Sequence, residues 1–230
     1  MKIHGLQKLT LLDFHEHVAC TVFLGGCDFR CPFCHNFELA EGKLSPIMED
    51  TELLSFLESR RGLLDGVAFT GGEPCLHPGL PDLMEKIRAL GYATKLDTNG
   101  CHPDVLRKIL DRGLADYVAM DIKNCPEKYA VTCGVPAVDL DVIRESIGLI
   151  MDRAPDYEFR TTVVRELHAA EDFHGMGRMI RGARRYFLQS FTDRDSVPFE
   201  GLHPPAKEEL LEYKAIAEAY VPETALRGVD

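Results

Sequence analysis

Long apolar runs and an excess of basic residues are both missing from this 230-residue sequence. No stretch approaches the roughly 20 apolar residues that a membrane-spanning helix needs. No secretory signal is expected, because charged residues such as Asp13 and Glu16 interrupt the first apolar stretches. The chain has 37 acidic and 26 basic residues, and this formal charge of −11 argues against general binding to nucleic acids or anionic membranes. We therefore expect a cytoplasmic protein with neither a nucleic-acid nor a membrane partner.

Internal repeats, low-complexity segments and obvious linkers are also absent, so we expect a single domain over residues 1–230. Its core is predicted to span about 9–190, and 191–230 are predicted to form a C-terminal extension with a helix. Strand-like and helix-like patterns alternate along this core. The strands are predicted at 18–24, 66–70, 92–97, 117–122, 157–164 and 185–191. The helices are predicted at 49–61, 80–90, 103–112, 138–152, 170–181 and 205–220.

These six β–α units predict an α/β fold with a parallel sheet and right-handed crossovers. The pattern alone allows either an open barrel or a flat, doubly wound sheet. In both, ligands bind at the carboxyl ends of the strands. Chemically active residues are therefore sought where each predicted strand ends.

Three cysteines follow the first predicted strand, with the spacing C-x3-C-x2-C at Cys27, Cys31 and Cys34. We expect no helix between Asn36 and residue 46, so they lie on a long loop. Cysteine thiolates are the ordinary ligands of iron–sulfur clusters. Three close ligands without a nearby fourth suggest a four-iron cluster with one iron left open.

A zinc knot or a loop of free thiols is the alternative interpretation of these cysteines. A structural zinc site usually needs four ligands, and His35 is poorly placed to share a metal with the adjacent Cys34. The remaining cysteines are scattered, and we expect them to be small buried residues. They are Cys20, Cys75, Cys101, Cys125 and Cys133.

Glycines and charged residues stand where later strands end. Gly71 and Gly72 end the second strand and allow the backbone to approach a ligand closely, while Glu73 adds a carboxylate. The third strand ends at Asp97 and Thr98.

Asp121 and Lys123 end the fourth strand on one face, because side chains alternate along a strand. They could pair with each other or meet the charged groups of a bound zwitterion. Arg160 on the fifth strand and Gln189 on the sixth could reach the same ligand. For Arg160, the alternative is a surface charge at a strand end.

The cysteine spacing, with Phe33 just before the last cysteine, resembles the signature of radical S-adenosylmethionine enzymes. This resemblance implies an open partial (β/α)6 barrel, a [4Fe-4S] cluster on the three cysteines, and S-adenosylmethionine on the open iron. The Gly71-Gly72-Glu73-Pro74 run resembles the element that holds the amino group of the methionine moiety in that family.

The Asp-Thr pair and the Asp-x-Lys run resemble the branch of the family that activates glycyl-radical enzymes. The resemblance implies that Asp121 and Lys123 contact S-adenosylmethionine, and that Asp97 and Thr98 help to bind a monovalent cation near its carboxylate. Run 9–14 and the continuation of the cluster loop into His35 and Asn36 most resemble activating proteins of anaerobic ribonucleoside-triphosphate reductase. His15-Glu16-His17 stands where such relatives often have Pro-Gly.

This branch implies an anaerobic oxidoreductase that cleaves S-adenosylmethionine reductively and places a glycyl radical on a partner enzyme. An external electron donor such as flavodoxin or ferredoxin is implied. No ferredoxin-like C-x2-C-x2-C insert lies between Asn36 and Gly66. Two alternatives stay open: a radical enzyme acting on a small molecule, and a non-enzymatic metal-binding or electron-transfer module. The second does not account for Glu73 or for the Asp-x-Lys pair, because an electron carrier needs no pocket for a zwitterion.

Overall fold

The computed structural model describes residues 1–229, and an eight-stranded sheet runs through it in the order β10-β9-β8-β7-β6-β5-β3-β2. Every neighbouring pair is parallel except β2 and β3, which are antiparallel. The strands are β2 (Gly5–Thr10), β3 (Ala19–Leu24), β5 (Gly66–Gly71), β6 (Ala93–Thr98), β7 (Tyr117–Asp121), β8 (Asp156–Val163), β9 (Tyr186–Ser190) and β10 (Thr224–Arg227). A separate antiparallel pair joins β1 (Lys2–Ile3) to β4 (Met48–Glu49).

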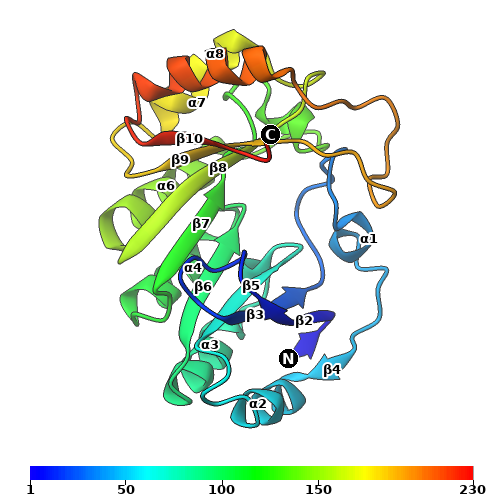
Figure 1. The fold of residues 1–230 in the computed structure, drawn as a ribbon, viewed down its shortest axis with the longest axis vertical. Coiled ribbons are helices and arrows are strands. Elements are labelled where there is room, and N and C mark those ends of the chain that lie inside the picture. Colours follow the sequence, from blue (N-terminus) through cyan, green and yellow to red (C-terminus); the bar gives the residue numbers. More distant parts are fainter. Residues whose placement is uncertain (230) are drawn as a thin grey trace.

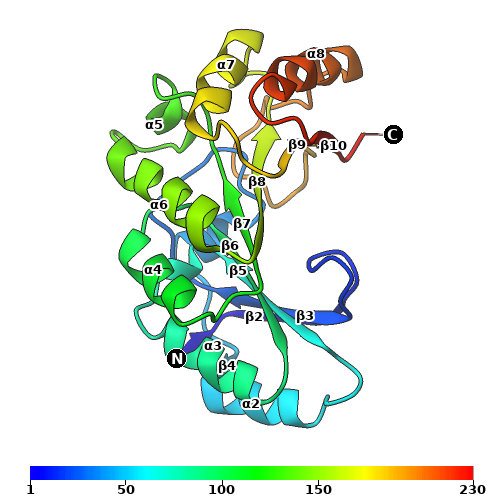
Figure 2. The same cartoon turned by 90° about the vertical axis from the view of Figure 1, so that its left-hand side faces the viewer.

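Helices follow the parallel strands and lie around the outside of the curved sheet (Figure 1; Figure 2). The longer ones are α2 (Asp50–Glu58), α3 (Leu80–Ala89), α4 (Pro103–Asp111), α6 (Leu140–Arg153), α7 (Ala170–Met179) and α8 (Lys207–Glu218). The short ones are α1 (Phe37–Ala40), the 3-10 turn η1 (Pro74–Leu76) and α5 (Tyr129–Thr132). The six predicted β–α units are confirmed. The expectation of a helix-free loop after Asn36 is wrong, because α1 forms there.

Each helix buries one apolar face against the sheet, as its sequence period requires. In α4, which starts at a proline, Val105 and Ile109 are fully or almost fully buried. On β3, Val22 and Leu24 are buried in the same core. Burial of each such side chain contributes about 1.5–3 kcal/mol. One face of the sheet therefore packs against the helices, and polar side chains can lie on the opposite face.

The C-terminal segment adds a strand that the sequence analysis did not predict. After α8 the chain returns as β10, which pairs in parallel with β9. Arg227 of β10 donates from Nη1 and Nη2 to the buried Glu158 of β8, over 2.6 and 2.8 Å. This bidentate pair spans β9 and ties the last strand to the sheet.

The sheet does not close into a full barrel, because its two edge strands in the described chain, β2 and β10, do not pair. Figure 1 shows the resulting arc, with α1 on its open side. No helix among residues 1–229 is long and apolar enough to cross a membrane. The predicted open partial barrel is confirmed, and its inner face is accessible from one side.

Candidate active site

The three cysteines of the predicted cluster line one cavity together with the carboxyl ends of β5, β6, β7 and β8. The loop that carries them leaves β3 at Gly25 and returns to α1. Cys31 is buried, whereas Cys27 and Cys34 are partly exposed. Phe33 lines the same cavity, and its ring centroid lies 6.0 Å from Lys123 Nζ. The fold therefore brings the cysteines to the strand ends at which the other predicted site residues stand.

His35 and Asn36, which follow the last cysteine, connect this loop by hydrogen bonds to the ends of β9 and β5. His35 Nε2 lies 2.7 Å from the carbonyl oxygen of Thr192, just after β9, and the ring stacks against Phe191. Asn36 Nδ2 donates to the carbonyl oxygen of Gly71 at the end of β5 over 3.2 Å. His35 thus bonds to the far side of the barrel, which speaks against its being the fourth ligand of a zinc knot.

The two glycines at the end of β5 let two stretches of backbone meet. Gly72 N–H donates to the carbonyl oxygen of Leu24 over 2.9 Å, and Glu73 N–H donates to that of Gly26 over 2.8 Å. A Cβ on Gly72 would lie 1.9 Å from the Gly26 oxygen. Gly71 and Gly72 line the cavity as predicted, and Gly72 also packs against the backbone that leads into Cys27.

The Glu73 carboxylate is fully buried and does not line the cavity. It accepts hydrogen bonds from Thr98 Oγ1 (2.7 Å) and from the backbone N–H groups of Asn99 (2.6 Å) and Cys75 (2.9 Å). Burial raises the pKa of Glu73 to about 7, and these three donors only partly offset this effect. Glu73 therefore positions the Asp97-Thr98-Asn99 turn.

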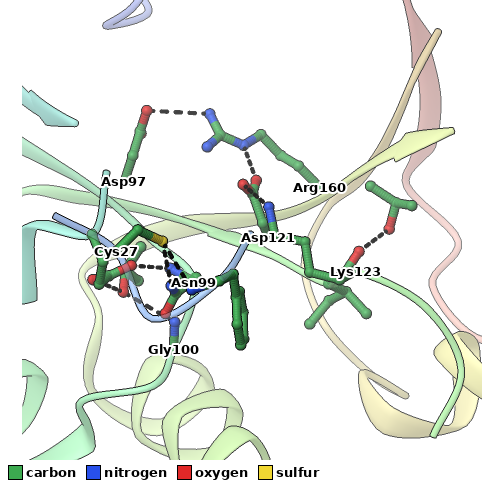
Figure 3. Close-up of polar contacts among 12 residues, drawn as sticks. Cys27, Asp97, Asn99, Gly100, Asp121, Lys123 and Arg160 are labelled. Atoms are coloured by element: carbon green, nitrogen blue, oxygen red, sulfur yellow. Dashed lines mark hydrogen bonds and ion pairs between the residues drawn. The ribbon is translucent and has the colours of Figure 1, made fainter. Parts of the chain in front are cut away.

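A row of alternating charges crosses the strand ends from β6 to β8, as Figure 3 shows for its central members. Asp97 Oδ1 lies 2.9 Å from Lys95 Nζ, and Asp97 Oδ2 lies 3.5 Å from Arg160 Nη1. Arg160 Nε donates to Asp121 Oδ1 over 3.0 Å, and Lys123 Nζ donates to Asp121 Oδ2 over 2.9 Å. Three cations face two carboxylates, so the row carries one excess positive charge.

The electrostatics keep this row ionised. Burial alone would raise the pKa of Asp121, but Lys123 and Arg160 outweigh it and lower the pKa to about 2. Burial likewise opposes the charge on Lys123, yet Asp121 raises its pKa well above the ordinary value. A charged, half-enclosed row with one excess positive charge can hold the carboxylate of an amino acid.

Most of the predicted cofactor residues line the cavity: Phe33, Gly71, Gly72, Asp97, Thr98, Asp121, Lys123 and Arg160. Glu73 and Gln189 are not among its lining residues. Gln189 pairs in register with Thr162 on β8 and Arg227 on β10. Sequence reasoning missed Asn99 and Thr162, which do line the cavity. Asn99 follows Asp97-Thr98 directly, so its place in the same turn was the available signal.

The thiols fit an iron–sulfur cluster by their chemistry and placement. Partial burial raises the pKa of the Cys27 and Cys34 thiols, to about 12 for Cys27. Among residues 1–229, no group of three or more His, Cys, Asp or Glu side chains converges to hold a metal ion. This does not argue against an iron–sulfur cluster, because its thiolates bind different iron atoms and need not converge on one point. The Phe29 N–H donates to Cys27 Sγ over 3.4 Å, as expected next to a cluster thiolate.

Comparison with known proteins decides the family, because the Radical SAM superfamily model matches residues 21–171. The chain belongs to the radical S-adenosylmethionine superfamily. Membership implies a [4Fe-4S] cluster and S-adenosylmethionine, for which the cysteine loop and the charged row provide suitable groups.

The relatives include proteins named as activating enzymes, and others named 7-carboxy-7-deazaguanine synthase. A protein of Methanocaldococcus jannaschii, provisionally named a glycyl-radical enzyme activating enzyme, is 28% identical over 99% of this chain and 96% of its own length. The pyruvate formate-lyase-activating enzyme of Clostridium pasteurianum is 33% identical over 54% of this chain and 52% of its own. A solved domain of the pyruvate formate-lyase-activating enzyme from Bacteroides vulgatus superposes with a TM-score of 0.58 at 19% identity, covering 71% of this chain and 99% of that domain. The solved domain supports the partial-barrel fold.

Proposed function

We propose that this radical S-adenosylmethionine enzyme activates a glycyl-radical enzyme. The observation that carries the proposal is the placement of Cys27, Cys31 and Cys34 in one cavity with the Asp97–Arg160–Asp121–Lys123 row. The three thiolates would hold a [4Fe-4S] cluster, and Arg160 and Lys123, the two cations of the row that line the cavity, would hold the methionine carboxylate. Similarity to two proteins named as activating enzymes supports this choice of branch.

Held by Cys27, Cys31 and Cys34, a [4Fe-4S] cluster would supply the one-electron reduction needed for reductive cleavage of S-adenosylmethionine, which would lead to a glycyl radical on the partner. The chain's own residues bind and orient; no side chain need act as acid or base. Lys123 and Arg160 keep Asp121 ionised, so the row stays charged at neutral pH. We propose that an external donor such as flavodoxin or ferredoxin supplies the electron in the cytoplasm.

The shape of the open side supports a polypeptide substrate. A second cavity of about 600 Å³ lies next to the first and shares His35, Asn36 and Phe37 with it. Gly5 and Phe23 of the sheet edge line it on one side, and residues 195–198 line it on another. A second cavity beside the cluster loop leaves room for a loop of a partner protein, which needs more space than a small molecule.

The partner and the ion are finer proposals. We propose an anaerobic ribonucleoside-triphosphate reductase as partner, because run 9–14 and Cys34-His35-Asn36 resemble its activating proteins. A monovalent cation next to Asp97 is also proposed, although Lys95 and Arg160 already face both of its oxygens. The affinity for S-adenosylmethionine in K⁺, Na⁺ and ion-free tetraalkylammonium buffers tests the ion; equal affinity in all three would overturn it.

The function is tested by anaerobic reconstitution with iron and sulfide, followed by reduction with S-adenosylmethionine and a panel of glycyl-radical proteins. We expect 5′-deoxyadenosine and a glycyl radical signal in electron paramagnetic resonance spectra, strongest with the anaerobic ribonucleotide reductase. Cys34→Ala protein is the control and should yield neither product. Cleavage with no glycyl radical on any partner would favour a small-molecule substrate, and a loaded cluster without cleavage would indicate an electron carrier.

A further inference from the structure

Two side chains from outside the cysteine loop lie against its sulfur atoms. Asn99 Nδ2 lies 3.5 Å from Cys27 Sγ, and Figure 3 shows it directed at that atom. Cys133, which caps the C-terminus of α5, is buried beside the cysteine loop, and its thiol interacts electrostatically with that of Cys31. Asn99 and Cys133 thus contact two different members of the cysteine triad, and neither has been given a role so far.

The amide of Asn99 can present only its NH₂ group to the sulfur. Its Oδ1 accepts the backbone N–H of Cys101 over 2.9 Å, which fixes which end of the amide is oxygen. Its own backbone N–H is held by Glu73 Oε2 over 2.6 Å, and the residue is 5% exposed. Asn99 is therefore a rigid, buried donor aimed at Cys27 Sγ.

Cys133 is held against the loop by backbone contacts. Its carbonyl oxygen accepts the Arg30 N–H over 2.8 Å, and its own N–H donates to the carbonyl of Tyr129 over 3.0 Å. The next residue, Gly134, packs so closely that an added Cβ would lie 2.1 Å from the Arg30 oxygen. Cys133 is completely buried, so its S–H faces protein groups and not water.

We propose that Asn99 and Cys133 are positioning residues that set the reduction potential of the cluster by donating hydrogen bonds to the sulfurs of Cys27 and Cys31. The inference rests on the proposed function only in requiring a cluster on these cysteines. Reduction adds one negative charge that is shared with the thiolate sulfurs. A donor at the sulfur stabilises the reduced form and raises the potential. Without these donors, the electron from an external carrier would be harder to accept.

The test is a redox titration of the reconstituted [4Fe-4S] protein without S-adenosylmethionine, followed by electron paramagnetic resonance. Asn99→Leu keeps the size of the side chain and removes the donor; Asn99→Ala is a second, smaller variant. Cys133→Ala removes the donor, and Cys133→Ser keeps one at nearly the same size. Iron and sulfide analyses confirm the loading of each variant, and Cys20→Ala is the control for loss of a buried thiol from β3, away from the loop.

We expect the Asn99 variants and Cys133→Ala to have a lower midpoint potential than the wild type. At a fixed applied potential, we expect the ratio of reduced to oxidised cluster to fall about tenfold, which corresponds to a shift of about 59 mV. Cys133→Ser and Cys20→Ala should stay near the wild type. Potentials unchanged in loaded Asn99→Ala and Cys133→Ala, or Cys133→Ser as low as Cys133→Ala, would overturn the proposal. So would a wild-type protein that binds no cluster. If the variants show these shifts but the wild-type protein forms no glycyl radical on any partner, the proposed function is refuted and this inference stands.

Discussion

Arg160 on β8 donates through Nε to Asp121 on β7 over 3.0 Å, and the two residues are partners in the register of the sheet. The same guanidinium reaches Asp97 on β6, with Nη1 3.5 Å from Oδ2. One side chain therefore joins the ends of three strands. The row works as a unit, because each carboxylate depends on this cation as well as on its own lysine.

Replacing Arg160 by glutamine should weaken S-adenosylmethionine binding at least tenfold, or about 1.4 kcal/mol. The two carboxylates would lose a shared cation, and the row would change from one excess positive charge to none. Calorimetric titration of the cluster-loaded protein measures the effect. Arg107→Gln is the matched control, because Arg107 pairs with Glu145 on the exposed surface (2.6 Å). Equal affinities of both variants would show that Arg160 has no part in binding.

Alanine at Cys27, Cys31 or Cys34 should abolish the iron–sulfur absorbance and the production of 5′-deoxyadenosine. The cluster needs all three thiolates, and no other cysteine lines the cavity in the described chain. Iron content and visible spectra after anaerobic reconstitution give the result. Cys20→Ala, in the core of β3, should keep the full iron content. A variant at Cys34 that still cleaved S-adenosylmethionine would contradict the assignment.

Gly72→Ala should destabilise the protein by more than about 2 kcal/mol and impair cluster loading, because the new methyl group would overlap the carbonyl oxygen of Gly26. That backbone cannot give way without displacing Cys27. Gly79→Ala is the matched control, because an added Cβ there meets nothing within 4 Å. Urea unfolding of both variants measures the difference. Similar losses at the two glycines would mean that the loop tolerates the shift.

The buried Glu73 should give the unfolding free energy a pH dependence. Its folded pKa, about 7, lies above the ordinary value of 4.5, so the folded state holds this proton more tightly. The stability from Glu73 is fully present below about pH 4.5 and falls as the pH rises towards 7. In Glu73→Gln this position cannot ionise, so the wild type should lose stability relative to the variant across that window. Denaturant titrations at several pH values measure this difference; two parallel profiles would place the Glu73 pKa near its ordinary value.

Much of the site was predictable because the signals are local. The cysteine spacing lies within eight consecutive residues, 27–34, and each charged motif stands directly after an apolar strand. Parallel strands bring their carboxyl ends to one edge, so Asp97, Asp121 and Arg160 could be expected to meet. Less local features were missed. The short strand β10 is specified by its pairing with β9 and by the Arg227–Glu158 contact, which lie far from it in sequence.

The sequence by itself determined the family, the parallel α/β scaffold and the residues available to the site, because composition and short spacings are properties of neighbouring residues. Only the tertiary structure decided which residues lie next to one another in the site. It placed the Glu73 carboxylate where it accepts hydrogen bonds from Thr98 and Asn99, since a fully buried carboxylate needs hydrogen-bond donors. It also brought Cys133, a residue with no local motif, against Cys31. Glu73 and Thr98 are 25 residues apart and Cys31 and Cys133 about a hundred, and packing, not sequence order, makes them neighbours.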